Sequence, residues 1–313
     1  MDSRINLKKI LSLCVIFAIC FLGYTRFWWT QHKEIFFQVL QRNITPLYPY
    51  LIEEEEKCRA QTPFLLLLIP SDPQEFHIRN VLRNTWANES LLNNVHIIRL
   101  FLLGRTTIDE EKVINESSQF HDIVMQDFID SYYNLTVKTL MGMEWVARWC
   151  PGVRYVVKID TDMFFNPWFL VKNILQPEGP PKKNFFTGFI LYNALPHRDK
   201  GSKWYMSMKT YSKKFYPLYC SGTGYVFSGD LAEKIYWAAE GLQMFPFEDV
   251  FVGMCLQKLG VTIFESSNKF IGEKIPYDRC KFTKIVTVHR FTPEELLTIW
   301  PDFLEAMETC SKS

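Results

Sequence analysis

Apolar runs and amphipathic segments alternate between residues 62 and 162, and this alternation constrains the fold more than any other feature. The apolar runs are typical of buried strands and fall at residues 64–69, 95–103, 122–128 and 154–159. The segments between them have helical spacing, at residues 75–86, 109–120 and 136–149. The alternation predicts an α/β domain with a mostly parallel sheet and helices on both faces. Loops after the strands then meet at one edge, where open α/β sheets bind ligands.

The second half of the chain is less regular. It predicts strands at residues 185–191, 220–227 and 285–288. It predicts helices at residues 230–239 and 248–259, and a last helix that begins at Pro293. Glycines punctuate the strand at 220–227, where they allow a backbone to approach a ligand closely. A bulge or tight bend explains them equally well.

Two carboxylates, Asp160 and Asp162, stand one residue apart directly after the apolar run Tyr155–Val157. The predicted fold places them at the ligand-binding edge of the sheet. A hard divalent cation prefers oxygen ligands of this kind, and a diphosphate in turn binds such a cation. The alternative is a turn at the end of a strand, in which the aspartates only cap the next segment.

The N-terminus carries a membrane signal. Arg4, Lys8 and Lys9 precede an apolar run from Ile10, and the aromatic residues at 27–29 resemble an interfacial belt. We expect a cytosolic tail at residues 1–9, a transmembrane signal-anchor in the lipid bilayer at 10–29, a lumenal stem at 30–61 and a folded domain at 62–313. The alternative is a cleaved signal peptide, but bulky aromatic residues stand where a cleavage site needs small ones.

Two further features fit a lumenal location. Sequons for N-glycosylation begin at Asn43, Asn88, Asn115 and Asn134, and Pro46 weakens the first of them. Six cysteines lie outside the apolar N-terminal run, at Cys58, Cys150, Cys220, Cys255, Cys280 and Cys310. An even number in an oxidising compartment suggests disulfides, although the sequence does not choose their pairing. Cys255 lies in an apolar helical pattern and fits a buried free thiol equally well.

Composition excludes several classes of function. The formal net charge is only +1, so the chain lacks the basic footprint of a nucleic-acid-binding protein. The sequence contains no Gly-rich phosphate loop, no H-E-x-x-H zinc motif and no pair of C-x-x-C motifs.

The sequence also contains an ordered set of short motifs. They are R-x-x-x-R-x-T-W at 79–86, F-L-L-G at 101–104, D-S-Y-Y-N-L-T-V-K-T-L-M-G-M at 130–143, K-x-D-x-D at 158–162, F-F-T-G-F at 185–189, S-K-W-Y at 202–205, C-S-G-T-G-Y-V-F-S-G-D at 220–230, E-D-V-F-V-G-M-C-L at 248–256 and T-V-H at 287–289. This ordered set resembles the β-1,3-galactosyltransferase family of Golgi type II membrane glycosyltransferases (glycosyltransferase family 31). Leu82 and Thr161 are mild departures from the family pattern, and residues 190–200 match no family motif. The resemblance implies a Rossmann-like GT-A catalytic domain that uses a nucleotide sugar and Mn²⁺.

The implied reaction moves galactose from UDP-galactose to the 3-hydroxyl of a GlcNAc or GalNAc on a glycoprotein or glycolipid, in the Golgi membrane. By resemblance, Asp162 is the first choice for a direct metal ligand, and Asp160 contacts the ribose or sugar and is a second metal candidate. His289 is the third metal candidate. An inverting transfer needs a carboxylate to take the acceptor proton, and Asp249 is our choice with Glu248 as runner-up. Acidic residues also suit a helix N-terminus, which explains the last two without catalysis.

The resemblance also implies a set of donor-binding residues: Arg79, Arg83, Asp130, Tyr133, Asn134, Lys138, Lys158, Asp160, Trp204, Gly222, Thr223 and Gly224. Arg79 and Arg83 share one helix face, and a solvated surface pair is the alternative. Trp204 suits stacking on a sugar, and core packing is its alternative. A glycan on Asn134 would conflict with a buried role in the donor site.

Three other functions are weighed against galactose transfer. Related enzymes that transfer N-acetylglucosamine share most of these motifs. A non-catalytic lumenal chaperone or glycan-binding protein would keep the fold, but it would not need the intact D-x-D and acidic pair. A secreted metal-dependent hydrolase lacks a visible motif.

Overall fold

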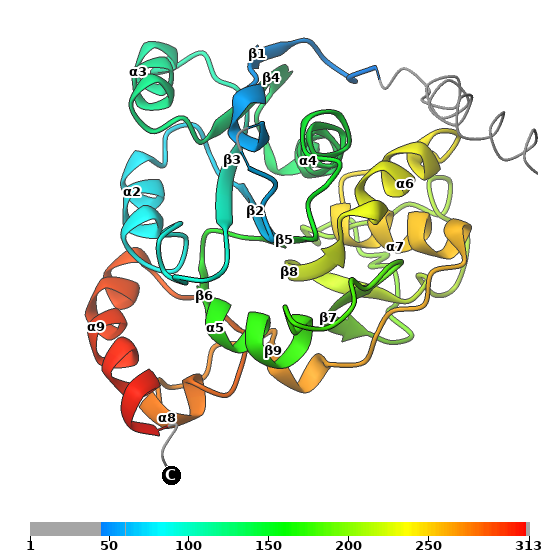
Figure 1. Cartoon of the computed structure of the whole chain (residues 1–313). Coiled ribbons are helices and arrows are strands. Elements are labelled where there is room, and N and C mark those ends of the chain that lie inside the picture. The colour runs from blue at the N-terminus through cyan, green and yellow to red at the C-terminus, as the bar shows by residue number, and fades with distance from the viewer. Residues whose placement is uncertain (1–44, 60, 311–313) are drawn as a thin grey trace, which may run out of the picture. The chain divides into compact units, whose positions relative to one another are not determined.

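A computed structural model of the chain describes residues 45–59 and 61–310. Seven strands form the main sheet in the order β1-β4-β3-β2-β5-β8-β7 (Figure 1). Their bounds are β1 Tyr50–Ile52, β2 Leu65–Pro70, β3 Ile97–Arg105, β4 Ile123–Ile129, β5 Tyr155–Ile159, β7 Phe186–Leu191 and β8 Tyr219–Ser228. Strands β4, β3, β2 and β5 run parallel, whereas β1 and β8 are antiparallel to their neighbours. The predicted α/β fold with a mostly parallel sheet is therefore confirmed.

Helices cover both faces of this sheet. Helices α4 (Leu135–Trp149), α6 (Asp230–Ala239) and α7 (Glu248–Leu259) pack together on one face (Figure 1). Helix α2 (Phe76–Asn84) packs against α9 (Pro293–Thr309), and α3 (Glu110–Phe120) follows β3. The remaining short helices are η1 Glu55–Cys58, η2 Tyr132–Asn134, α5 Pro167–Phe169, the π-helix η3 Leu170–Leu175, η4 Ser267–Lys269 and α8 Arg279–Phe282.

A second, three-stranded sheet joins β6 (Met163–Phe165), β10 (Thr287–His289) and β9 (Phe270–Ile271). Strand β6 begins one residue after Asp162, and its Met163 pairs with His289 across the antiparallel ladder. The backbone N–H of Phe291 donates to the carbonyl of Asp162 at 2.8 Å. This small sheet therefore brings the second aspartate of the D-x-D motif beside a histidine more than one hundred residues later.

The folded unit begins earlier than the expected boundary at residue 62. Strand β1 adds to the edge of the main sheet beside β4, and Trp145 donates its indole N–H to the carbonyl of Glu53 at 2.5 Å. A disulfide joins Cys58 to Cys150, with 5.5 Å between their Cα atoms. The last part of the predicted stem is thus packed on the domain. Its lack of periodicity reflects a strand of only three residues.

A second disulfide joins Cys280 to Cys310, whereas Cys220 and Cys255 are buried thiols. Two disulfides fit the oxidising compartment that the sequence predicts. The predicted anchor at residues 10–29 lies outside the described residues. In the part of the chain that the structure describes, no helix has the length and hydrophobicity to span a bilayer.

Candidate active site

A cavity of about 640 Å³ lies at the carboxyl end of β5, and the segment that follows β4 also lines it. Residues that the sequence spreads over more than 150 positions line it, among them Tyr132, Lys158, Asp160, Asp162, His197, Lys203, Trp204, Gly222, Thr223, Glu248, Asp249, His289 and Arg290. Four carboxylates belong to this lining: Asp160, Asp162, Glu248 and Asp249. We call these carboxylates, with Lys158 and Gly222 beside them, the floor of the cavity. The structure therefore brings together the D-x-D motif, the acidic pair and His289.

Lys158 holds three parts of the floor in place. Its ammonium group lies 2.6 Å from Asp160 Oδ1 and 2.9 Å from Glu248 Oε1, and it donates to the carbonyl of Gly222. Burial lowers the pKa of Lys158, but Asp160 and Glu248 outweigh burial and raise it above its ordinary value. A permanently charged lysine thus ties β5 to β8 and to the start of α7.

The two residues of the acidic pair have different environments. Glu248 is buried, and its carboxylate also accepts from the Tyr225 hydroxyl at 3.0 Å. Asp249 is only partly buried, and its Oδ2 accepts from the backbone N–H of Gly222 at 3.1 Å. Burial raises the pKa of Asp249, although the N–H groups of Val250 and Gly222 oppose the rise. Asp249 therefore presents a carboxylate of increased basicity to the cavity, whereas the carboxylate of Glu248 is engaged with Lys158 and Tyr225.

The raised pKa of Glu248 predicts that the stability of the fold depends on pH. Burial raises its pKa from 4.5 to about 7, with Lys158 lowering and Asp249 raising the value. A carboxyl group with a raised folded-state pKa stabilises the fold below pH 4.5, and this contribution is lost as the pH rises through 7. Relative to Glu248→Gln, the free energy of unfolding of the native protein should fall by up to about 3 kcal/mol between about pH 4.5 and 8. Denaturant titrations of both proteins across this range measure the difference, and a pH-independent difference would contradict the assignment.

Asp162 and His289 form the only pair on the cavity lining, among the described residues, that joins a carboxylate to an imidazole within contact distance. His289 Nε2 lies 3.2 Å from Asp162 Oδ2, and this contact raises the pKa of His289. His289 Nδ1 lies 3.2 Å from the carbonyl of Gly272, which orients Nε2 toward Asp162. Within residues 45–59 and 61–310, no group of three or more His, Cys, Asp or Glu side chains is arranged to hold a metal.

This pair fits a divalent cation that takes its remaining ligands from a diphosphate and water. Cations that bind nucleotides commonly use one or two protein ligands and leave the other positions to phosphate and water. An imidazole beside a carboxylate favours Mn²⁺ over Mg²⁺. The donor set therefore fits the Mn²⁺ that the resemblance implies.

Gly222 fits the floor because it lacks a side chain. A Cβ atom there would lie 2.6 Å from Glu248 Oε1 and 3.5 Å from the Cβ of Asp249. At Gly224, two residues along the same strand, the nearest atom would be Ile159 Cγ1 at an ordinary 3.6 Å. Gly224 is also absent from the cavity lining.

This contrast predicts different outcomes for two alanine substitutions. Gly222→Ala should reduce turnover by about 10- to 100-fold, because small displacements of reacting groups are costly. Gly224→Ala should keep turnover within about threefold, since it meets only ordinary contacts. Initial rates of the two purified variants test this. Equal losses in both would show that the fit at Gly222 has no special role.

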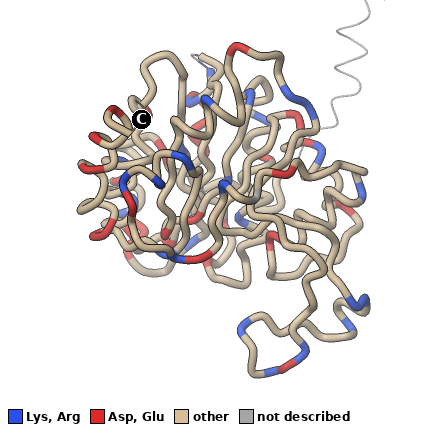
Figure 2. Tube along the Cα trace, turned by 90° about the horizontal axis from the view of Figure 1, so that it is seen from below, with Lys and Arg blue, Asp and Glu red and all other residues tan. Residues whose placement is uncertain are grey.

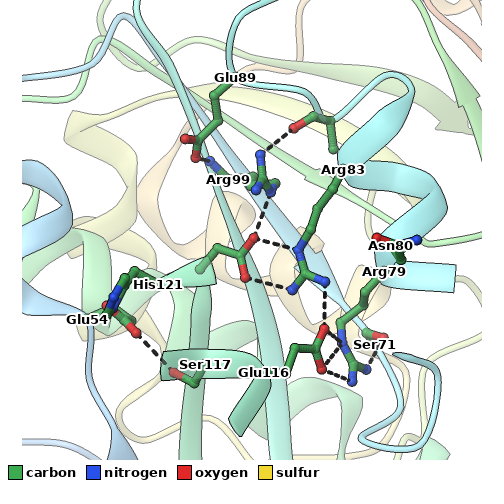
Figure 3. Close-up of polar contacts among 12 residues, drawn as sticks. Glu54, Ser71, Arg79, Asn80, Arg83, Glu89, Arg99, Glu116, Ser117 and His121 are labelled. Atoms are coloured by element: carbon green, nitrogen blue, oxygen red, sulfur yellow. Dashed lines mark hydrogen bonds and ion pairs between the residues drawn. The ribbon is translucent and has the colours of Figure 1, made fainter. Parts of the chain in front are cut away.

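Arg79 and Arg83 do not lie on this cavity. Arg79 donates to Glu116 at 2.6–3.1 Å, and Arg83 contacts Glu116 at 2.7 Å and Asp122 at 2.8 Å (Figure 3). Asp122 also accepts from Arg99 at 2.8 Å. The expected contact of both arginines with the donor stays a prediction that their position off this cavity does not support, and the alternative, a solvated surface pair, is wrong because both side chains are buried. Their shared helix face is turned inward, where two carboxylates neutralise them.

Asp130 and Lys138 form a second buried pair that does not line the cavity. Asp130 accepts from Lys138 Nζ and from the backbone N–H of Gly104, both at 2.7 Å, and Lys138 also donates to the carbonyl of Ser71. This pair joins the ends of β2, β3 and β4 to α4. Its position is consistent with support of the site rather than with direct contact.

The segment after β4 places a neighbouring tyrosine in the cavity instead of the expected one. Tyr132 lines the cavity, whereas Tyr133 is 65% exposed and absent from the lining. The amide of Asn134 donates to the carbonyl of Ile129 at 2.8 Å, and Asn134 does not line the cavity. Because Asn134 lies off the cavity, the expected conflict between a glycan on Asn134 and a buried role in the donor site does not arise.

Glycosylation at the other sequons is still a prediction from the sequence. Asn115 is exposed on α3, and Asn88 is partly exposed and accepts from the backbone N–H of Ser90 at 2.9 Å. Asn43 lies outside the described residues.

Several lining residues were not predicted from the sequence, among them Tyr132, His197, Lys203 and Arg290. Arg290 adopts a left-handed backbone with φ of 69°, which is uncommon for a residue other than glycine. It follows His289 in a segment with no regular pattern, and only its adjacency to the T-V-H motif could have indicated it. His197 and Lys203 lie in the connection between β7 and β8.

Solved structures show only distant similarity. The chain shares 12% identity with an apo WbbM bifunctional glycosyltransferase (79% of this chain, 50% of that chain; TM-score 0.40). It shares 10% identity with galactosyltransferase LgtC in complex with donor and acceptor sugar analogues (78% and 95%; TM-score 0.38).

Sequence relatives are much closer. The chain is 45% identical to β-1,3-galactosyltransferase 2 of Homo sapiens over 259 residues, which is 81% of this chain and 61% of that protein. It thus spans about three fifths of that relative. It is 43% identical to β-1,3-galactosyltransferase 1 of Mus musculus over 270 residues, which is 85% of this chain and 82% of that protein. The family model described as Galactosyltransferase matches residues 77–267. The chain therefore belongs to the galactosyltransferase family.

Proposed function

We propose that this protein transfers galactose from UDP-galactose to the 3-hydroxyl of a terminal GlcNAc or GalNAc, with inversion, to form a β-1,3 linkage. One observation carries the proposal: the Asp162–His289 pair and the carboxylate of Asp249 line the same cavity. The Asp162–His289 pair is suited to bind a cation that a diphosphate also binds. The Asp249 carboxylate is suited to accept a proton from the acceptor hydroxyl. Membership of the galactosyltransferase family supports the choice of sugar.

The diphosphate would bind beside Asp162 and His289, which would hold Mn²⁺. When bound, the cation supplies Lewis-acid stabilisation to the departing UDP. Asp160 is held by Lys158 at 2.6 Å and faces the cavity, so one of its oxygens remains for a ribose or sugar hydroxyl. Gly222 and Thr223 line the wall next to it and would border the donor sugar.

Asp249 would act as the general base. Its increased basicity and its access to the cavity suit removal of a proton from the acceptor hydroxyl as the new carbon–oxygen bond forms. Glu248 would act as a positioning residue, because its carboxylate is engaged with Lys158 and Tyr225. The pair that the sequence left unresolved thus receives two separate roles.

We propose a Golgi membrane location with the folded domain in the lumen. The two disulfides support an oxidising compartment. The signal-anchor at residues 10–29 stays a prediction from the sequence.

A panel of UDP-sugars tests this function against the N-acetylglucosamine alternative. Purified protein with Mn²⁺ and acceptors ending in GlcNAc or GalNAc should transfer galactose faster than N-acetylglucosamine. Preferential transfer of N-acetylglucosamine would instead favour a β-1,3-N-acetylglucosaminyltransferase. Binding of UDP-galactose or a glycan without any transfer would favour the non-catalytic alternative.

A further inference from the structure

We propose that the preferred acceptor is an anionic glycan, bearing carboxylate or sulfate groups near its terminal sugar. The connection between β7 and β8, residues 192–218, would bind it. This inference rests on the proposed function and names the substrate class of the same site. We call this connection the β7–β8 segment.

The β7–β8 segment is held in a defined conformation although it contains no helix or named strand. The guanidinium group of Arg198 donates to the carbonyls of Met206 at 2.7 Å and Tyr211 at 2.8 Å. The backbone N–H of Tyr216 donates to the carbonyl of Ala194 at 2.9 Å. Long ordered connections of this kind commonly carry binding functions.

The segment supplies one wall of the cavity. Leu195, His197, Lys203 and Trp204 belong to the lining. The side chain of Trp204 is 50% exposed, and the ring of His197 lies 5.6 Å from it. The alternative role for Trp204, packing in the core, is wrong because half of its surface is exposed to solvent. The two rings form an aromatic surface suited to the apolar face of a sugar.

The charge of the β7–β8 segment is opposite to that of the four carboxylates on the cavity lining. Of the basic residues in the segment, Lys203 belongs to the lining. The segment carries six basic residues and one acidic residue, Arg198, Lys200, Lys203, Lys209, Lys213, Lys214 and Asp199, a net formal charge of +5. The whole chain has a net charge of +1, so the remaining residues sum to −4. In Figure 2, basic positions predominate on the loops that project from the body of the domain.

The five lysines of the segment are exposed, and over residues 45–59 and 61–310 none forms a salt bridge with a carboxylate. The Nζ of Lys203 lies 4.3 Å from the centre of the Tyr132 ring, and both residues belong to the cavity lining. Uncompensated like charges repel one another, and an anionic ligand relieves that repulsion. The acidic floor would be occupied by the cation and donor. An acidic group on the acceptor therefore has its matching charge on the β7–β8 segment.

Matched acceptors test the proposal. Two oligosaccharides with the same terminal GlcNAc are compared, one neutral and one with a sulfate on the penultimate sugar; a third arm carries a carboxylate there. The native protein should use both charged acceptors about tenfold better in kcat/KM, and the preference should shrink between about 50 and 300 mM salt, because salt screens exposed charges.

A triple variant should lose most of this preference: Lys200→Gln, Lys203→Gln and Lys209→Gln. A control variant removes the same charge from exposed lysines elsewhere and should keep it: Lys172→Gln, Lys281→Gln and Lys284→Gln. The readout is the ratio between acceptors within each protein, so a general loss of turnover does not mimic the effect.

Equal use of the three acceptors by the native protein, or an equal loss of preference in both variants, would overturn the proposal. Equal use combined with binding to anionic phosphatidylserine vesicles, abolished by the first variant, would assign the charge to a membrane surface and also overturn it. No transfer to any acceptor would instead contradict the proposed function.

Discussion

Replacing Asp249 with asparagine is expected to lower kcat for galactose transfer by about 10²- to 10⁴-fold, the usual contribution of a general base. The asparagine side chain is nearly the same size as the aspartate, and its oxygen can still accept from the N–H of Gly222, which lies 3.1 Å from the native carboxylate. The geometry of the floor should therefore survive. The change removes the ability to take a proton, so donor binding should be retained.

Two measurements separate loss of the base from loss of structure. UDP binding by calorimetry in the presence of Mn²⁺ should change by less than about threefold, because a general base acts in the transition state rather than in donor binding. The control Asp127→Asn removes an exposed carboxylate that pairs with Arg105 at the surface, and it should keep its turnover. Retained turnover in Asp249→Asn, together with its loss in Glu248→Gln, would assign the base to Glu248.

Replacing Arg83 with methionine is expected to destabilise the fold by about 3 kcal/mol or more, as removal of one partner from a buried ion pair does. Arg83 is buried and contacts both Asp122 and Glu116 (Figure 3). Its removal leaves carboxylate oxygens in the interior with fewer donors. Denaturant unfolding measures this loss, and the KM for UDP-galactose of the protein that remains folded should be unchanged.

The control for this variant is Arg105→Met. Arg105 pairs with Asp127 at 3.1 Å, but the two side chains are 51% and 40% exposed. Exposed pairs contribute only about 0 to 1 kcal/mol, so this substitution should be nearly neutral. If Arg83→Met folded as stably as Arg105→Met while its KM for the donor rose about tenfold, Arg83 would return to the donor site.

Strand and helix positions followed from the sequence because their patterns are local. The helix predicted at residues 248–259 is α7 with the same bounds, and the strand predicted at 154–159 differs from β5 by one residue. Apolar periodicity in the sequence indicates which side of a helix or strand is buried, and the structure buries that side in these elements. Strands β1, β6 and β9 have three residues or fewer, which is too short for a period to show.

The candidate site was predicted in part. The D-x-D motif, the acidic pair and His289 meet in one cavity, as the family motifs implied. The burial of Arg79 and Arg83 could not be predicted. Helical spacing shows that two residues share a face, but it does not show whether that face packs against buried carboxylates. Glu116 and Asp122, which receive them, lie more than thirty residues later and follow no motif.

The conformation of the β7–β8 segment could not be predicted from sequence patterns. Residues 190–200 match no family motif, and they include His197 on the cavity wall. The conformation of this segment depends on single contacts such as those of Arg198 with backbone carbonyls. Such contacts leave no periodic signal in the sequence, so the contribution of this segment to the cavity was less predictable than that of the D-x-D motif.

The most direct test of the account is galactose transfer from UDP-galactose to a GlcNAc-terminated acceptor, measured with and without Mn²⁺ for the native protein and Asp162→Ala, with linkage analysis of the product. We expect a β-1,3-linked product that forms with Mn²⁺ and falls by at least about 100-fold in Asp162→Ala, because that variant removes a side chain proposed to hold the cation. The absence of transfer from any UDP-sugar, or undiminished transfer in Asp162→Ala, would contradict the account.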